Sequence, residues 1–404
     1  MKELGRESGD LAAALAVAFV CAACSSTPTA KPDQHAIEQF VSNGYQPPRH
    51  DTVRSAAIDW IEADSSWHFE LLVPERVDRA PLVVYLPGLG QDEQAGERWT
   101  RAWAQAGYAV MSIQPLTEDQ QAWSSDNARS GNFDAVARQG FSDAAMKRRL
   151  EALNSALVQL GRRAAAGDPV LHSVDLSRVA VAGFDLGAYS AMVIAGQQLE
   201  ATGRPALSTP VRAVIALSPF ADASVAANDQ RFSAILGPVL NITGTQDVDA
   251  YGLIESAGLR AQPFQLMPPG DKYLVSLALG SHGLIGGADP TPLSAQLPEV
   301  RRAQRPDRGD EPSPDRRGHK RQSSAAADPD PSAQPDDAAG AQAGGQTRAS
   351  RSELLTRQAL SSASVRIVTT AFLDAYLRGD PAARSWLNQR ARQWLTPNAS
   401  LAIR

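Results

Sequence analysis

The chain has little cysteine, few aromatic residues and no excess of positive charge. Two of its 404 residues are cysteine and 6% are aromatic. Cys21 and Cys24 both lie in an apolar stretch near the amino terminus, so neither a disulfide framework nor a cysteine-ligated zinc site can hold the fold together. Lysine and arginine total 39 against 44 acidic residues, a formal net charge of -5. Without a global positive field, nucleic acid is not an expected partner.

Histidine is also scarce, and long apolar runs are missing beyond residue 30. The six histidines are scattered, and no pair has the helical or hairpin spacing of a metal site. No later stretch approaches the roughly 18 to 20 apolar residues that a membrane-spanning helix needs. We therefore expect no metal site and no membrane span. The 43% apolar content is still ample for a large core.

The amino-terminal segment indicates export and lipid attachment. Residues 11–23 form a short apolar run, and two alanines precede Cys24. This pattern resembles a bacterial lipoprotein signal, in which small residues before a cysteine permit cleavage and the cysteine carries the lipid. The resemblance implies a signal over residues 1–24, lipidation of Cys24 and, because Ser25 follows, an outer-membrane protein that faces the periplasm. The alternatives are an ordinary secretory peptide and a buried helix.

Composition divides the rest of the chain. Residues 25–50 are polar and rich in proline, and we expect a tether there. Residues 51–404 are expected to form one domain. Within them, the tract 301–353 has no Val, Ile, Leu, Met, Phe, Tyr, Trp or Cys, which predicts a disordered insertion before the last helix. A helical pattern resumes at Leu354 and is expected to end at Gly379.

Between residues 52 and 287, strand-like and helix-like runs alternate. The pattern predicts strands at 56–60, 67–73, 82–86, 108–113, 179–182, 213–217, 239–243 and 273–279, with a hairpin between the first two. Apolar residues over 146–160 recur at spacings of three and four, which predicts an amphipathic helix that Gly161 ends. Strands that are apolar throughout and are separated by helices predict an α/β fold, with a mostly parallel twisted sheet flanked by helices.

One turn in this pattern carries the candidate chemistry. Residues 183–187 read Gly-Phe-Asp-Leu-Gly and lie between an apolar strand and an alanine-rich helix. Small residues two positions on either side of the central residue, Asp185, let the strand and the helix approach closely. Downstream, Asp247 and His282 each follow a predicted strand. The chain order of a nucleophile position, an acid and a histidine is that of a hydrolase triad.

These residues resemble the α/β-hydrolase superfamily, and more narrowly its platelet-activating-factor acetylhydrolase and dienelactone hydrolase-like branch. The similarity covers roughly residues 52–287 and the helix after residue 354. It implies an α/β-hydrolase fold, a small-molecule substrate and no metal or organic cofactor. It also implies catalytic roles for Asp185, Asp247 and His282, with Asp249 as an alternative acid.

The same resemblance implies the source of an oxyanion hole. The loop after the third strand reads Pro87-Gly-Leu89-Gly, so the Leu89 amide matches one donor, and Leu186, after the nucleophile position, matches the other. The loop differs from the family in carrying Pro87 where histidine is usual. This difference matters little, because the hole uses backbone amides.

The aspartate at the nucleophile position matters more, because the family carries serine there. A carboxylate that attacks an ester forms an anhydride and must expel a far more basic alkoxide, so the adduct collapses back. Three functions stay open: hydrolysis of an ester-like substrate by an unusual mechanism or a displaced nucleophile, a catalytically silent binding protein in which Asp185 only caps a helix, and displacement at saturated carbon.

Haloalkane dehalogenases and epoxide hydrolases carry out the third reaction with an aspartate nucleophile. The chain resembles them less well. Leu186 stands where dehalogenases have a halide-binding tryptophan, and residues 220–239 are too few for a cap domain with epoxide-activating tyrosines.

Overall fold

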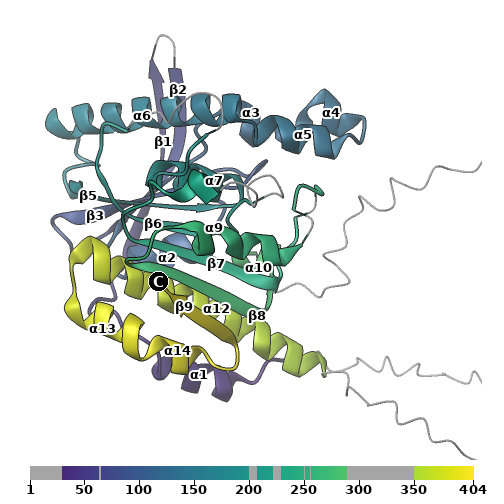
Figure 1. Ribbon diagram of the computed structural model, residues 1–404. Coiled ribbons are helices and arrows are strands. Elements are labelled where there is room, and N and C mark those ends of the chain that lie inside the picture. Colours follow the sequence, from purple (N-terminus) through teal and green to yellow (C-terminus); the bar gives the residue numbers. More distant parts are fainter. Residues whose placement is uncertain are drawn as a thin grey trace, which may run out of the picture.

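A nine-stranded sheet lies at the centre of the protein (Figure 1). The computed structural model describes residues 30–62, 65–199, 207–221, 229–249, 251–254, 256–288 and 350–404. The strands are β1 (Val53–Glu62), β2 (Ser65–Pro74), β3 (Ala80–Leu86), β4 (Ala109–Ile113), β5 (Val174–Phe184), β6 (Val211–Leu217), β7 (Val239–Gln246), β8 (Lys272–Ser281) and β9 (Ala399–Ile403). Their order across the sheet is β1-β2-β4-β3-β5-β6-β7-β8-β9.

Most neighbouring strands are parallel. The block from β4 through β3, β5, β6 and β7 to β8 is parallel throughout, whereas β2 runs antiparallel to β4 and pairs with β1 as a hairpin. All eight predicted strands are present, and the prediction of an α/β protein with a mostly parallel sheet is confirmed. The ninth strand, β9, was not predicted; it pairs antiparallel with β8 at the sheet edge, a long-range contact that no local pattern indicates.

Helices cover both faces of the sheet. They are α1 (Gln34–Ser42), α2 (Glu97–Gln105), α3 (Thr117–Gln120), α4 (Asp126–Arg129), α5 (Phe133–Gly140), α6 (Asp143–Ala165), α7 (Leu186–Ala195), α9 (Gln262–Leu266), α10 (His282–Ile285), α12 (Arg351–Leu373), α13 (Pro381–Gln389) and α14 (Ala391–Leu395). In Figure 1, α6 lies above the sheet, and α12, α13 and α14 lie below it. None of the helices in the described part of the chain has the length and apolar character needed to cross a membrane.

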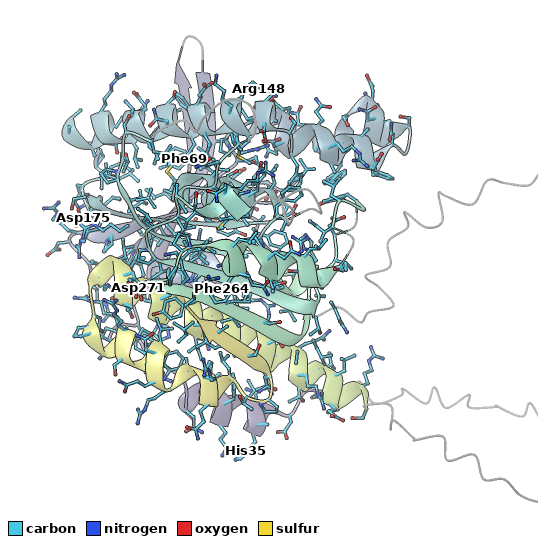
Figure 2. All side chains as sticks on the ribbon, in the orientation of Figure 1. His35, Phe69, Arg148, Asp175, Phe264 and Asp271 are labelled. Carbon is cyan, nitrogen blue, oxygen red and sulfur yellow. The ribbon has the colours of Figure 1, made fainter. Side chains whose placement is uncertain are left out.

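The alternation of side chains along the strands creates two cores. On β3, Val83 and Tyr85 join the apolar cluster beneath α2 and α12, and Leu82 and Val84 join the cluster beneath α6 and α7. The second core also contains Phe69 and reaches α9 at Phe264, both of which are buried (Figure 2). A strand with both faces covered must be apolar throughout, which is why the parallel strands show no polar alternation.

The prediction of a tether over residues 25–50 is wrong for the second half of that range. Residues 34–42 form α1, and Trp394 stacks on Phe40 with ring centroids 4.3 Å apart while its Nε1 donates a hydrogen bond to the Phe40 carbonyl. The Tyr45 hydroxyl donates a buried hydrogen bond of 2.9 Å to Asp374. These aromatic contacts outweigh the local polarity and make this part of the chain belong to the domain. Residues 25–29 lie outside the described residues, as does the predicted signal with Cys24.

The predicted insertion also needs a correction at its end. Helix α12 starts at Arg351, so residues 351–353 are helical and not part of a disordered tract. The cause is local, since the Ser350 hydroxyl accepts a hydrogen bond of 3.2 Å from the Glu353 backbone amide and caps the helix. Residues 301–349 lie outside the described residues. At its other end α12 passes into a π-helical turn, η4 (Asp374–Arg378), and stops at Gly379 as predicted.

Helix α6 does not end at Gly161, as the sequence predicted, but continues to Ala165. A β-carbon at Gly161 would meet no atom within 4 Å, so this glycine lies on an open side of the helix. The buried residues Leu157 and Leu160 pack into the core, and their burial outweighs the roughly 1 kcal/mol that one glycine costs a helix. The chain leaves the helix only at Gly167, which has a φ of 82°.

We expect the substitution Gly161→Ala to raise the free energy of unfolding by about 0.5–1 kcal/mol, because alanine restricts the unfolded chain and fits the open side of the helix. Urea unfolding of both proteins measures the difference. Gly167→Ala is the matched control, since its β-carbon would also meet nothing within 4 Å but its φ is left-handed. That variant should lose about 1–2 kcal/mol. Equal shifts in the two variants would contradict the explanation.

Candidate active site

Asp185 occupies a sharp turn between β5 and α7. Its backbone has φ 53° and ψ −110°, which a non-glycine residue adopts only when its surroundings hold it there. The two flanking glycines explain how: a β-carbon at Gly187 would lie 1.8 Å from the Leu86 carbonyl oxygen, and one at Gly183 would lie 2.2 Å from the Gly187 oxygen. The close approach of backbone segments that the sequence pattern predicted is therefore present.

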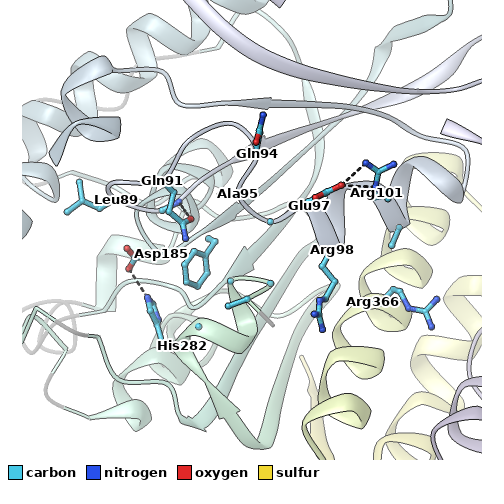
Figure 3. A pocket seen from close by; sticks show the side chains of 18 of the residues that line it. Leu89, Gln91, Gln94, Ala95, Glu97, Arg98, Arg101, Asp185, His282 and Arg366 are labelled. Atoms are coloured by element: carbon cyan, nitrogen blue, oxygen red, sulfur yellow. Dashed lines mark hydrogen bonds and ion pairs between the residues drawn. The ribbon is translucent and has the colours of Figure 1, made fainter. Parts of the chain in front are cut away.

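The structure brings all three predicted catalytic side chains together. Asp247 follows β7 and His282 follows β8, and the His282 Nδ1 lies 2.8 Å from Asp247 Oδ1. The other ring nitrogen, Nε2, lies 3.7 Å from Asp185 Oδ1, which is longer than a hydrogen bond (Figure 3). His282 thus lies between two carboxyl groups. Its Nδ1 contacts Asp247, and its Nε2 faces Asp185.

Asp247, the partner of His282 Nδ1, is fixed by buried hydrogen bonds. Its side chain is fully buried, and its two oxygens accept hydrogen bonds from Ser218 Oγ at 2.9 Å and Thr243 Oγ1 at 2.8 Å. Burial raises the pKa of Asp247, but the hydrogen bond from His282 and the charge of Arg260 together outweigh it, so the pKa lies below its ordinary value. Asp247 is therefore an ionised group that fixes the orientation of the His282 ring.

Arg260 is a member of the site that sequence reasoning missed. It belongs to the short helix η3 (Ala257–Ala261), is fully buried, and its Nε lies 3.1 Å from Asp247 Oδ1. Its guanidinium also donates to the backbone oxygens of Asp247 and Ser218, each at 2.9 Å. This cation compensates the buried Asp247 charge. Nothing in the spacing of the sequence around residue 260 indicates such a role.

The alternative acid, Asp249, has a different task. Its Oδ1 accepts backbone hydrogen bonds from Tyr251 at 2.7 Å, from Gly252 at 2.5 Å and from Leu253 at 3.1 Å, and its Oδ2 accepts one from Ile254. A carboxylate engaged in this way orders the loop after β7. Asp247, and not Asp249, contacts His282.

The Asp185 carboxyl group is almost completely buried, with 2% of the residue exposed. Burial raises its pKa, the charges of His282 and Arg260 act in the opposite direction, and the net shift is upward. The adjacent Leu186 backbone amide also acts to lower this pKa. A carboxylate with a raised pKa has lost much of its hydration, and so it forms a new bond more readily than a solvated one.

The two predicted oxyanion-hole residues both lie beside Asp185. Leu186 follows it directly as the first residue of α7, so its backbone amide lies next to the Asp185 carboxyl group. The loop that contains Leu89 also reaches this point, because a β-carbon on Gly88 would come within 3.3 Å of the Asp185 β-carbon. Leu89 is buried in an apolar cluster with residues of α5 and α6, and among the described residues its amide has no hydrogen-bond acceptor.

A cleft of about 680 Å³ opens onto Asp185 and His282 (Figure 3). Helix α2 forms one wall, and Arg366 on α12 also lines the cleft. Tyr251 lines it too, with its ring 5.1 Å from that of Trp123, and burial and the Asp185 charge hold the pKa of the Tyr251 phenol far above its usual range. The phenol therefore keeps its proton and has no hydrogen-bond partner in the described part of the chain. Sequence reasoning missed Tyr251.

No group of three or more potential metal ligands occurs among the described residues. The chain matches no model of a known protein family, and a search of curated proteins found no similar sequence.

Proposed function

We propose that this protein is a hydrolase with an α/β-hydrolase fold that acts on a small molecule through Asp185, His282 and Asp247. Three features support the fold assignment: the strand order, the antiparallel second strand, and a nucleophile position after β5 with an acid after β7 and a histidine after β8. The buried carboxylate at the sharp turn, facing the free nitrogen of a histidine whose other nitrogen is held, supports a catalytic role.

The chemistry that fits an aspartate at this position is displacement at saturated carbon. An Asp185 oxygen attacks the carbon, the bond to the leaving group breaks, and the leaving group departs with the electron pair. The product of this step is an alkyl ester of Asp185. Tyr251, with its proton retained, is available to hydrogen-bond the departing atom.

In the second step, His282 Nε2 takes a proton from water, and the resulting hydroxide attacks the carboxyl carbon of Asp185. The ester bond then breaks, and the alcohol leaves with the proton from His282. The negative charge of the tetrahedral intermediate develops on an oxygen of Asp185 itself. The Leu186 amide, next to this carboxyl group, would stabilise that charge. The observation that carries the proposal is the position of His282, whose Nε2 lies 3.7 Å from Asp185 Oδ1 while its Nδ1 is held by Asp247.

Direct hydrolysis of an ester fits the site less well. The anhydride that Asp185 would form with the acyl group collapses back, because the alkoxide that must be expelled is far more basic. The second candidate is a catalytically silent binding protein, which the almost complete burial of Asp185 favours if no substrate carbon reaches its carboxyl group. Lipid attachment at Cys24 and an outer-membrane location stay part of the proposal for the whole chain.

A single-turnover experiment in water labelled with oxygen-18 tests the covalent route. The protein, in excess, is mixed with bromohexane or hexene oxide, and the alcohol product is analysed by mass spectrometry. We expect the first turnover to give unlabelled oxygen in the new hydroxyl group, because that oxygen comes from Asp185. The label should appear in the Asp185 side chain, and in the alcohol only after repeated turnovers.

A labelled alcohol in the first turnover would mean that water attacks the substrate directly, and it would overturn the nucleophilic role of Asp185. Absence of turnover with every alkyl halide and epoxide tested, together with unchanged protein mass, would leave the silent binding protein as the explanation.

A further inference from the structure

The loop after β3 is closed by the side chain of Gln91. Its Oε1 accepts a hydrogen bond of 2.9 Å from the Gly88 backbone amide, and its own backbone amide donates to the Gly88 carbonyl oxygen at 3.2 Å. Gln114, directly after β4, adds a second link, because its Nε2 donates to the backbone oxygens of Gly88 and Gln91 at 3.1 and 3.3 Å. Two glutamine side chains therefore brace this loop.

The bonds within the loop leave its middle amide free. The Gly88 amide is taken by Gln91, and the Gly90 amide donates to the Asp119 carbonyl oxygen at 2.8 Å. The Leu89 amide, which lies between them in the chain, has no acceptor in the parts of the chain that the structure describes. A free amide between two bonded ones is in place before substrate binds, so it needs no reorganisation when negative charge develops nearby.

The braced loop lies against Asp185. A β-carbon at Gly88 would lie 3.1 Å from Gln91 Oε1 and 3.3 Å from the Asp185 β-carbon, so the Gln91 carboxamide and Asp185 come close to each other at this glycine. Gln91, Leu89 and Asp185 all line the cleft. In Figure 3, Gln91 and His282 lie on opposite sides of Asp185. The loop is thus placed to act on the carboxyl group that His282 faces.

We propose that Gln91 is a positioning residue for the second step of the reaction, an inference that rests on the proposed function. When hydroxide attacks the alkyl ester, the carbonyl oxygen of Asp185 takes the negative charge, and backbone amides are the usual donors to such an oxygen. The Leu186 amide supplies one donor. Gln91 bonds the amide that precedes Leu89 and thereby holds the Leu89 amide as the second.

The first step depends less on this loop. As Asp185 attacks the substrate carbon, negative charge leaves the carboxylate and moves to the departing atom. A donor that is fixed near the Asp185 carbonyl oxygen therefore gains strength only in the second step, and it accelerates only that step. This difference between the two steps distinguishes a positioning role in the oxyanion hole from a general effect on the shape of the cleft.

The variant Gln91→Met tests the role, because methionine has a similar size but no strong acceptor. In single turnovers with bromohexane, the alkyl ester on Asp185 is followed by intact mass. We expect the ester to disappear about 10- to 100-fold more slowly than in the wild-type protein, since a misplaced oxyanion donor loses much of its effect. In the steady state kcat should fall while kcat/KM stays unchanged, because kcat/KM reports only the steps up to the loss of bromide.

Hydrogen exchange of the Gly88 amide tests the brace without turnover. We expect Gln91→Met to raise the exchange rate about 2- to 10-fold, the net value of one hydrogen bond, and Gln91→Glu to keep the wild-type rate, because glutamate retains the acceptor oxygen. Gln94→Met is the matched control, since Gln94 is exposed in the same loop and bonds Asp92 Oδ1 through its backbone amide. It should change neither the exchange rate nor the decay of the ester.

The two measurements separate this inference from the proposed function. Faster exchange in Gln91→Met, without turnover in any variant, would support the brace and contradict the hydrolase. An ester that decays in Gln91→Met as fast as in the wild-type protein, or a kcat/KM that falls together with kcat, would overturn the positioning role and leave the hydrolase intact. Exchange that rises equally in Gln91→Glu would show that the acceptor oxygen does not hold the loop, and it would overturn the role as well.

Discussion

The Asp185→Ser variant should lose turnover of alkyl halides and epoxides by about 10⁶-fold, the magnitude seen when a covalent nucleophile is removed. The serine hydroxyl is a poor nucleophile toward saturated carbon, whereas the buried carboxylate is suited to it. The same change removes the carboxyl group beside the Leu186 amide and places a hydroxyl near His282 Nε2, which lies 3.7 Å from Asp185 Oδ1 in the wild-type protein. We therefore expect the variant to gain hydrolysis of short nitrophenyl esters.

Asp185→Asn is the control for this substitution. It has nearly the same shape, so it should occupy the turn without new contacts, but its amide is not a nucleophile. Both activities should then be absent. Esterase activity in the wild-type protein that survives Asp185→Asn would instead point to a displaced nucleophile elsewhere in the cleft.

The candidate catalytic residues were predictable because each has a signal in its own neighbourhood. Asp185 lies between two glycines after an apolar strand, and Asp247 and His282 each follow a largely apolar strand. Parallel strands place their carboxyl ends at one edge of a sheet, so residues far apart in the chain meet there. The order of the residues and the type of the strands were enough to predict their proximity.

The supporting residues were not predictable, because their positions depend on contacts between distant segments. Arg260 reaches Asp247 from a short helix, and Tyr251 enters the cleft from a loop that Asp249 shapes. Nothing near these residues in the sequence marks a catalytic motif.

The errors in the fold prediction have a related cause. Tyr45 lies in a segment whose prolines and polar residues are typical of a tether. Its hydroxyl nevertheless donates a buried hydrogen bond to Asp374. Gly161 looked like a helix end because local propensity disfavours glycine, whereas packing along the rest of α6 decides the helix length. In both places tertiary contacts outweigh a local preference of about 1 kcal/mol.

The His282→Gln variant tests the central mechanism most sharply. Glutamine cannot take the proton from water, so the second step should slow by about 10²- to 10⁴-fold, the usual contribution of a general base. The first step needs only the Asp185 carboxylate and the cleft, and it should still proceed. The alkyl ester should therefore accumulate, whereas in the wild-type protein it is removed by water.

Intact-mass spectrometry of His282→Gln after incubation with bromohexane gives the direct answer, and peptide mapping locates the adduct. The account predicts a mass increase of one hexyl group on the peptide that contains Asp185, and no increase in the double variant Asp185→Asn/His282→Gln. An unchanged mass in the His282→Gln variant of a protein that turns over bromohexane, or an adduct on any residue other than Asp185, would contradict the aspartate nucleophile.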